Sequence, residues 1–138
     1  MQTGIAKSAG RIQAILGDDV RVVESLIFRA LPSDRPVLVI ASGSVRVDER
    51  RVAELLGEKI GRADADFVRD RTGFAIGGVP PVGHRVSPVT YIDESLFSYP
   101  LIWAAAGTPN AVFQTTAQDL ARLTGGTVTC ISNRVDPA

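Results

Sequence analysis

The sequence predicts a single α/β domain in which helices surround a mixed, mostly antiparallel sheet. Three observations predict this fold class. Short apolar runs that favour strands recur along the 138 residues. Helix patterns bounded by capping residues and glycines separate some of these runs. Other runs are joined by tight turns, so the connections suit a mixed sheet better than a regular βαβ array.

The chain is expected to start with a helix followed by a strand hairpin. Apolar residues at helical spacing predict a helix over Ile5–Leu16. Val20–Ala30 is rich in β-branched residues and predicts a strand, and the continuous apolar run Val37–Ser42 predicts a fully buried one. Because Leu31–Pro36 contains two prolines and suits a turn, we expect the two strands to pair.

A well-marked helix follows the hairpin. Asp48 is placed to cap its first turn, and Gly57 is placed to end it. Val52, Leu55 and Leu56 recur at helical spacing, so we expect them to form its buried stripe.

A second helix and a long loop occupy the middle of the chain. The helix is predicted from Asp64 to about Arg71, with Phe67 and Val68 facing inward and Gly73 as its stop. The following residues, FAIGGVPPVGHR, have the composition of a loop.

The last third alternates short strands with helical turns. Thr116 and Asp119 resemble a capping box for a helix with Leu120 and Leu123 inward and Gly125 at its end. The other expected elements are four strands, at Val86–Ile92, Leu101–Ala106, Ala111–Gln114 and Thr127–Ser132, a helical turn at Asp93–Ser98, and a loose tail at Asn133–Ala138.

Composition excludes several classes of protein. Fifteen basic residues balance fifteen acidic ones, so any attraction to nucleic acid or to a membrane must be local. No stretch approaches 18 apolar residues and no cleavage signal is recognisable, so we expect a soluble, cytoplasmic protein without a membrane contact. One Cys and one His exclude an intramolecular disulfide and multi-His or Cys-cluster metal sites. We expect neither metal nor cofactor.

The most unusual stretch is Gly77–His84, GGVPPVGH. Its glycines let the backbone approach a ligand, and its two prolines stiffen the loop. Exposed amides on a rigid loop can hold a carbonyl oxygen or stabilise an oxyanion. The alternative is a tight connection between two strands, since glycine and proline are also the commonest turn residues.

Side-chain chemistry is sparse. His84 could be a general base or a substrate contact, but a lone histidine is more often a partly buried residue that pins its loop. No nucleophilic triad can be assembled, and Cys130, inside the last expected strand, suits a buried, inert thiol. The acidic pairs Asp64/Asp66 and Asp93/Glu94 each lie where a helix would begin, so capping and the helix dipole explain them.

The residues from Phe67 to His84, with the string TGFAIGGVPPVGH, resemble the centre of the YbaK/EbsC family. Ser25–Ala30 resembles its early strand, VRVDERRVAELLG (45–57) its capped helix, and Trp103–Gly107 with Asn110–Phe113 a later segment. The similarity covers roughly residues 20–132 of one domain spanning 1–138. This is the aminoacyl-tRNA deacylase fold shared with the editing domain of prolyl-tRNA synthetase.

The resemblance implies a barrel-like mixed sheet and hydrolysis of the ester that joins a wrong amino acid to the 3′ end of a tRNA. The partner is then the tRNA acceptor end, and a synthetase contact is compatible with it. Loop amides would hold the substrate carbonyl while water attacks with help from substrate hydroxyls. The implied catalytic residues are Gly77, Gly78, Gly83 and Glu24, and the implied substrate-binding residues are Ser25, Val79, Pro80, Pro81, His84, Gly107 and Asn110.

Two residues depart from the family pattern. Glu24 stands where the family typically has a Lys, and Asn110 lies where many members have a His. If a strand already includes Glu24, its side chain shares a face with Val22, Leu26 and Phe28. Partial burial would then raise the pKa of its carboxyl and make it a usable base; otherwise it is a solvated strand end.

The sequence therefore supports three functions. The first is a free-standing deacylase of mischarged tRNA. The second is a catalytically impaired member that binds aminoacyl-tRNA or a small aminoacyl-like ligand, which the change of charge at Glu24 favours. The third is a subunit that binds a partner through a sheet edge. The amino acid removed and the oligomeric state stay open.

Overall fold

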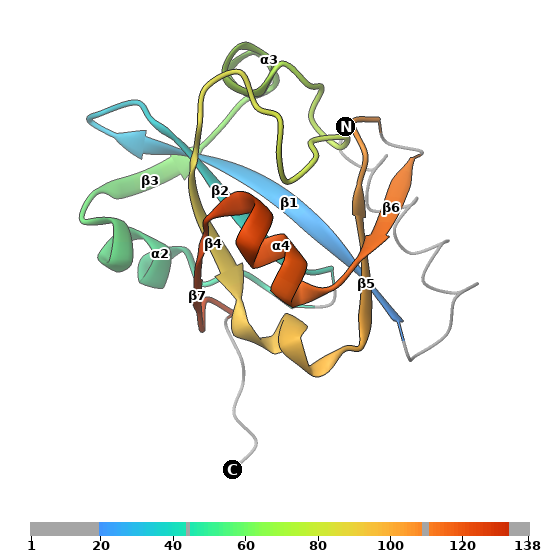
Figure 1. The fold of residues 1–138 in the computed structure, drawn as a ribbon. Coiled ribbons are helices and arrows are strands. Elements are labelled where there is room, and N and C mark those ends of the chain that lie inside the picture. The colour runs from blue at the N-terminus through green and yellow to red at the C-terminus, as the bar shows by residue number, and fades with distance from the viewer. Residues whose placement is uncertain (1–19, 44, 109–110, 133–138) are drawn as a thin grey trace.

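Strand β1 (Val20–Leu31) organises the sheet, because it pairs with three other strands. The computed structural model describes residues 20–43, 45–108 and 111–132 (Figure 1). The expected helix at Ile5–Leu16 and the tail at Asn133–Ala138 lie outside this range.

The described residues form seven strands, three α-helices and one 3₁₀ helix. After β1 come β2 (Pro36–Ser42), α2 (Glu49–Leu56), β3 (Lys59–Arg62), α3 (Ala65–Thr72), β4 (Val89–Asp93), η1 (Glu94–Ser98), β5 (Leu101–Ala105), β6 (Val112–Thr115), α4 (Ala117–Thr124) and β7 (Thr127–Thr129).

The mixed sheet with helices packed on it is confirmed. Its order is β6-β5-β1-β2-β4-β7, with β3 also paired to β1. Both strand directions occur, and the longest pairing, between β1 and β2, is antiparallel. The pairs β1–β2, β1–β3 and β5–β6 are antiparallel, whereas β1–β5, β2–β4 and β4–β7 are parallel. Among the described residues, β6 and β7 are the last strands of this order.

Local signals in the sequence placed the helix ends correctly. Asp48, Asp64 and Thr116 each accept a hydrogen bond at a helix N-terminus, from the amides of Arg51, Phe67 and Asp119. Gly57, Gly73 and Gly125 end α2, α3 and α4 with positive φ angles of 80°, 85° and 66°. These are the left-handed caps that glycine adopts without strain.

The two faces of the sheet carry separate cores. One includes Val23, Leu38 and Ile92 and is covered by η1 and by α4 through Leu120; we call it the α4 face. The other includes Val37, Val39 and Tyr91 and is covered by α2 through Val52; we call it the α2 face. Because side chains alternate along a strand, neighbours on β1 belong to opposite faces.

The prediction that Leu55 and Leu123 face the core is wrong. Leu55 is 42% exposed and Leu123 is 62% exposed, although their partners Val52 and Leu120 are fully buried. Helices of eight residues present only about two turns, and the sheet covers a narrower stripe than the apolar pattern suggests.

Strand boundaries also differ from the expectation. The strand expected from Val86 begins at Val89, and the one expected over Thr127–Ser132 ends at Thr129, although Ser132 forms an isolated bridge with Val47. The short strand β3, KIGR, was not predicted, since its single large apolar residue, Ile60, gives no alternation.

Asp93 is not the helix cap expected from its position. It is fully buried at the end of β4 and makes no capping bond to η1. Its carboxylate instead accepts the amide of Ile131 at 3.1 Å and the hydroxyl of Ser95. Asp93 therefore connects β4 to the segment after β7.

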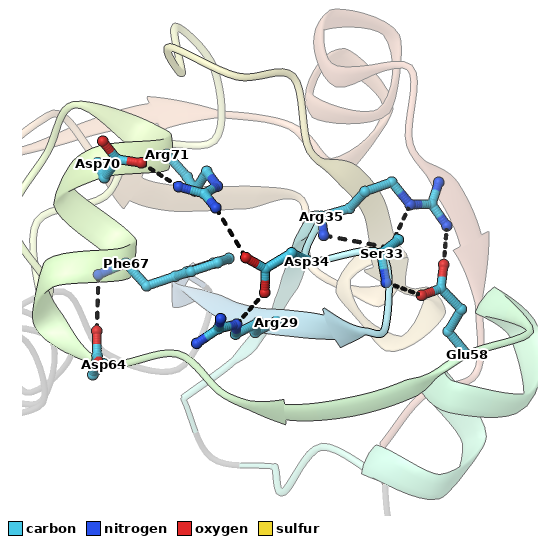
Figure 2. A network of polar contacts seen from close by, with 9 residues as sticks. All are labelled: Arg29, Ser33, Asp34, Arg35, Glu58, Asp64, Phe67, Asp70 and Arg71. Atoms are coloured by element: carbon cyan, nitrogen blue, oxygen red, sulfur yellow. Dashed lines mark hydrogen bonds and ion pairs between the residues drawn. The ribbon is translucent and has the colours of Figure 1, made fainter.

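Polar contacts fix the tip of the β1–β2 hairpin to its neighbours (Figure 2). Asp34 at the tip binds Arg29 of β1 and Arg71 of α3, and both guanidinium groups lie over the Phe67 ring, 5.2 and 4.7 Å from its centroid. These arginines hold the pKa of the Asp34 carboxyl below its ordinary value. The network holds α3, and the loop that follows it, beside β1.

Candidate functional site

Among the described residues, one edge of β1 has no strand partner in its middle. On that edge β1 pairs with β5 up to Val22 and with β3 from Phe28 onward. Between these two points the described residues provide no neighbouring strand, although β2 pairs with the opposite edge without interruption. The sheet therefore opens at residues 23–27.

The backbone of Ser25 faces this opening. The amide of Gly43 donates to Val22 O, and the amide of Ala30 donates to Arg35 O, so the even-numbered residues of β1 are hydrogen-bonded to β2. In an antiparallel pair the residues between them direct their N–H and C=O groups to the other edge. Ser25 is such a residue, and its Oγ is buried without a hydrogen-bond partner among the described residues.

The loop between α3 and β4 extends from the β3 side of this opening to the β5 side. Val79 belongs to a buried cluster with Phe67 and Val68 of α3, against which Ile27 of β1 packs. At the other side, a methyl group placed on Gly107, just after β5, would lie 3.5 Å from the ring of Phe74. The loop thus contacts the elements on both sides of the opening.

Hydrogen bonds close the base of the loop. The amide of Arg85 donates to Thr72 O at 3.0 Å, and that of Val86 donates to Arg71 O at 2.8 Å. The Thr72 hydroxyl donates to Val68 O at 2.7 Å and accepts the amide of Phe74 at 2.9 Å. The loop is therefore attached to α3 at both of its ends.

Two internal contacts fix the shape of the loop itself. The amide of Gly78 donates to Ala75 O at 3.0 Å, and His84 Nε2 lies 2.6 Å from Pro80 O. Gly77 and Gly83 have φ angles of 93° and 84°, a region that side chains disfavour.

Several loop amides are unpaired, and two of them, those of Val82 and Gly83, belong to exposed residues. The Gly78 amide is engaged within the loop, whereas those of Gly77, Val79, Val82, Gly83 and His84 have no acceptor among the described residues. Free N–H groups on a fixed backbone suit an oxygen that carries negative charge.

Glu24 lies on the opposite face of the sheet from the loop. The register of β1 with β2 is continuous, so Glu24 shares the α2 face with Leu26 and Phe28, whereas Ser25 lies on the α4 face. The strand starts at Val20, so Glu24 is not a solvated strand end. Burial raises the pKa of its carboxyl above the ordinary value.

A cavity of about 180 Å³ lies beside the loop on the α4 face. Its walls are loop residues 81–84, the start of β4 and the end of α4, at Thr90, Leu123 and Thr124. His84 is half-buried there, and burial lowers the pKa of its imidazole, although its hydrogen bond to Pro80 acts in the opposite direction.

The structure places the expected site residues at several points of one face. Ser25 faces the opening in the sheet, Val79 packs with Ile27 beside it, and Phe74 lies against Gly107, whereas loop residues 81–84 line the cavity against Thr90 and α4. Glu24 lies on the other face, and Asn110 lies outside the described residues. Strand alternation alone could have separated Glu24 from Ser25, but no local signal marks the unpaired edge or the contact between Phe74 and Gly107.

The described residues lack two features, a cluster of metal ligands and a membrane-spanning helix. No group of three or more His, Cys, Asp or Glu side chains in the described ranges could hold a metal ion. No helix within those ranges is long and apolar enough to cross a membrane.

Solved structures share this architecture. A proposed trans-editing enzyme for prolyl tRNA synthetase superposes with a TM-score of 0.84 at 38% identity, over 92% of this chain and 80% of that one. Hypothetical protein APE2540 superposes with a TM-score of 0.81 at 28% identity, over 91% and 83%.

Sequence comparison gives the same relationship. The uncharacterized protein YwhH of Bacillus subtilis (strain 168) is 31% identical over 100 residues, which are 72% of this chain but only 63% of YwhH. The model of the aminoacyl-tRNA editing domain family matches residues 5–123. The chain therefore belongs to the aminoacyl-tRNA editing domain family.

Proposed function

We propose that this protein is a trans-acting deacylase, which hydrolyses the ester between a wrong amino acid and the 3′ end of a tRNA. The observation that carries the proposal is the loop at residues 74–84, which is closed at its base, fixed internally and carries unpaired amides, those of Val82 and Gly83 at exposed residues beside a cavity. The similarity to a proposed trans-editing enzyme supports the same activity.

In this mechanism the loop amides bind the ester carbonyl oxygen. Water adds to the carbonyl carbon, and the resulting oxyanion is held by N–H groups that need no rearrangement. The C–O bond to the ribose then breaks, the ribose oxygen takes up a proton, and the amino acid leaves with the added hydroxyl. Gly77 and Gly83 are the proposed donors, and Ser25 and Gly107 are proposed to line the site.

The protein provides no evident side-chain base within this loop. A carbonyl oxygen only accepts hydrogen bonds, so His84 Nε2 must donate to Pro80 O and cannot take a proton from water. Activation of water is therefore assigned to hydroxyl groups of the substrate, and the protein contributes binding and electrostatic stabilisation.

The test is release of amino acid from a panel of mischarged tRNAs by the purified chain. We expect at least one to be hydrolysed, and Gly83→Ala to lower its kcat/KM by roughly 10–100-fold, because a misplaced loop loses much of an oxyanion contact. Gly57→Ala is the matched control, since both glycines have φ near 80° and an open space where the methyl group would lie. If no tRNA in the panel is hydrolysed, the proposal is wrong.

The carboxyl group of Glu24, at a position where the family typically has a Lys, favours one alternative, a module that binds aminoacyl-tRNA without hydrolysis. Such a module would bind the same tRNA and leave the ester intact. The variant Glu24→Lys separates the two functions, because it would create hydrolysis in an impaired module. In a deacylase whose reaction occurs on the α4 face, it would leave turnover close to that of the natural protein.

A further inference from the structure

His84 closes a five-residue ring at the tip of the loop. Its Nε2 lies 2.6 Å from Pro80 O, so the ring runs from Pro80 to His84 through Pro81, Val82 and Gly83. Pro81 has a fixed φ and no N–H. The amide donors of the ring therefore come from Val82, Gly83 and His84 itself.

The ring has a buried side and an accessible side. Pro80 and Pro81 are buried, whereas Val82 and Gly83 are exposed. The histidine contact thus forms where solvent cannot replace it, while the free amides at 82 and 83 are open to a ligand. Without this contact the buried Pro80 carbonyl would have no donor among the described residues, which costs about 1–3 kcal/mol for a buried polar group.

We propose that His84 is a positioning residue, whose neutral Nε2–H form holds the Pro80 carbonyl and thereby sets the direction of the loop amides. This inference rests on the proposed deacylase function for its catalytic consequence, but the hydrogen bond itself does not. His84 is not assigned a contact with the substrate.

The surroundings of the His84 imidazole favour its neutral form. Nδ1 is buried and has no hydrogen-bond partner among the described residues, so a proton there would be unpaired. The Phe74 ring lies 6.3 Å away, centroid to centroid, and the cavity beside His84 is lined by uncharged side chains from the loop, β4 and α4. Arg85 is the adjacent charge, and its guanidinium donates to Asp70 O. No described carboxylate therefore lies in the cavity lining to stabilise an imidazolium.

The first test needs no substrate. His84 is the only histidine in the chain, so nitrogen NMR of the protein labelled at histidine reports on this imidazole alone. We expect the neutral Nε2–H tautomer at pH 7 and a titration midpoint below the ordinary 6.5. The Nδ1–H tautomer, or an unshifted titration, would overturn the inference whether or not the protein is a deacylase.

The second test compares two amide variants on the same mischarged tRNA. In His84→Gln the side-chain nitrogen can reach the place of Nε2, whereas in His84→Asn it is too short. We expect His84→Asn to lower kcat by roughly 10–100-fold with KM little changed, because the loop donors are misplaced while the surfaces that bind the tRNA stay intact. His84→Gln should stay within a few-fold of the natural rate.

The pH profile adds a readout that loss of folding would not mimic. Activity of the natural protein should fall on the acid side as the imidazole takes up a proton and leaves its buried position, and His84→Gln should lack this fall. Equal rates for the Asn variant and the natural protein, or equal impairment of Gln and Asn with both variants folded, would contradict the inference. If the natural protein hydrolyses no tRNA, the deacylase proposal fails, while the NMR result still decides the role of His84.

Discussion

At the scale of residues, Glu24 shows how the fold changes the chemistry of a side chain. The carboxyl is partly buried on the α2 face of β1, next to Gly43, where a methyl group would lie 3.7 Å from its Cδ. Burial disfavours the charged form, so the native state holds this proton more tightly than the unfolded chain does. Glu24 therefore lowers stability at neutral pH.

This effect has a defined pH window. Below the ordinary value of 4.5 the carboxyl is protonated in both states, and it has no effect on stability. As pH rises above 4.5 the unfolded chain loses its proton first, so unfolding becomes easier until the native carboxyl has also ionised. We expect Glu24→Gln to raise the Tm at pH 7 and to have little effect at pH 4.

Thermal denaturation at the two pH values measures this difference. Glu54→Gln, on the exposed surface of α2, is the matched control and should change neither Tm appreciably. A gain from Glu24→Gln that is the same at pH 4 and pH 7 would show that packing, rather than ionisation, is responsible.

At the scale of elements, α4 shows that a sequence can predict where a helix forms without predicting which of its residues are buried. The capping Thr116 and the terminal Gly125 define its ends, and both were recognisable in the sequence. The side that the helix presents to the sheet was not recognisable, because Leu120 and Leu123 both suit an apolar stripe. Only the packing on the α4 face makes Leu120 a core residue.

A pair of identical substitutions tests this difference. Leu120→Ala, at a site with no exposure, should lower the free energy of unfolding by about 2–5 kcal/mol, because a cavity remains in the core. Leu123→Ala, at a site that is 62% exposed, should change it by no more than about 0.5 kcal/mol. Urea denaturation of both variants gives the comparison, and similar losses would mean that α4 packs differently.

At the scale of the whole molecule, the candidate site is a product of topology. Strands β5 and β3 pair with the same edge of β1 but separate between Val22 and Phe28. The loop after α3 contacts both sides of this opening, through Val79 on one side and Phe74 on the other. The loop therefore lies against residues that are far apart in the chain.

The contact between Phe74 and Gly107 tests whether this arrangement matters for function. Gly107→Val would place a branched side chain at a φ of 105° and against the Phe74 ring. We expect a loss of stability of about 1–3 kcal/mol from backbone strain, together with a marked fall in deacylation. Gly125→Val at the end of α4, with φ 66° and no contact within 4 Å, should be strained but should keep its activity. Equal activity of the two variants would mean that the contact between Phe74 and Gly107, on the β5 side of the opening, does not matter for deacylation.

Much of the fold and part of the site could be predicted from the sequence. The hairpin of β1 and β2, the helix caps and the irregular loop at 74–85 follow from local signals: apolar runs, side chains that accept a hydrogen bond at a helix start, and glycines that tolerate positive φ. The loop itself, GGVPPVGH, could be singled out by its composition.

The sequence by itself determined where the three α-helices start and end and which segment forms the irregular loop, because those properties depend on a few neighbouring residues. Only the tertiary structure decided that β3 forms, that Leu55 and Leu123 face outward, and that Phe74 lies against Gly107. Pairing and burial depend on partners distant along the chain. The opening in the sheet exists because β5 pairs with β1 only up to Val22 and β3 pairs with it only from Phe28 onward.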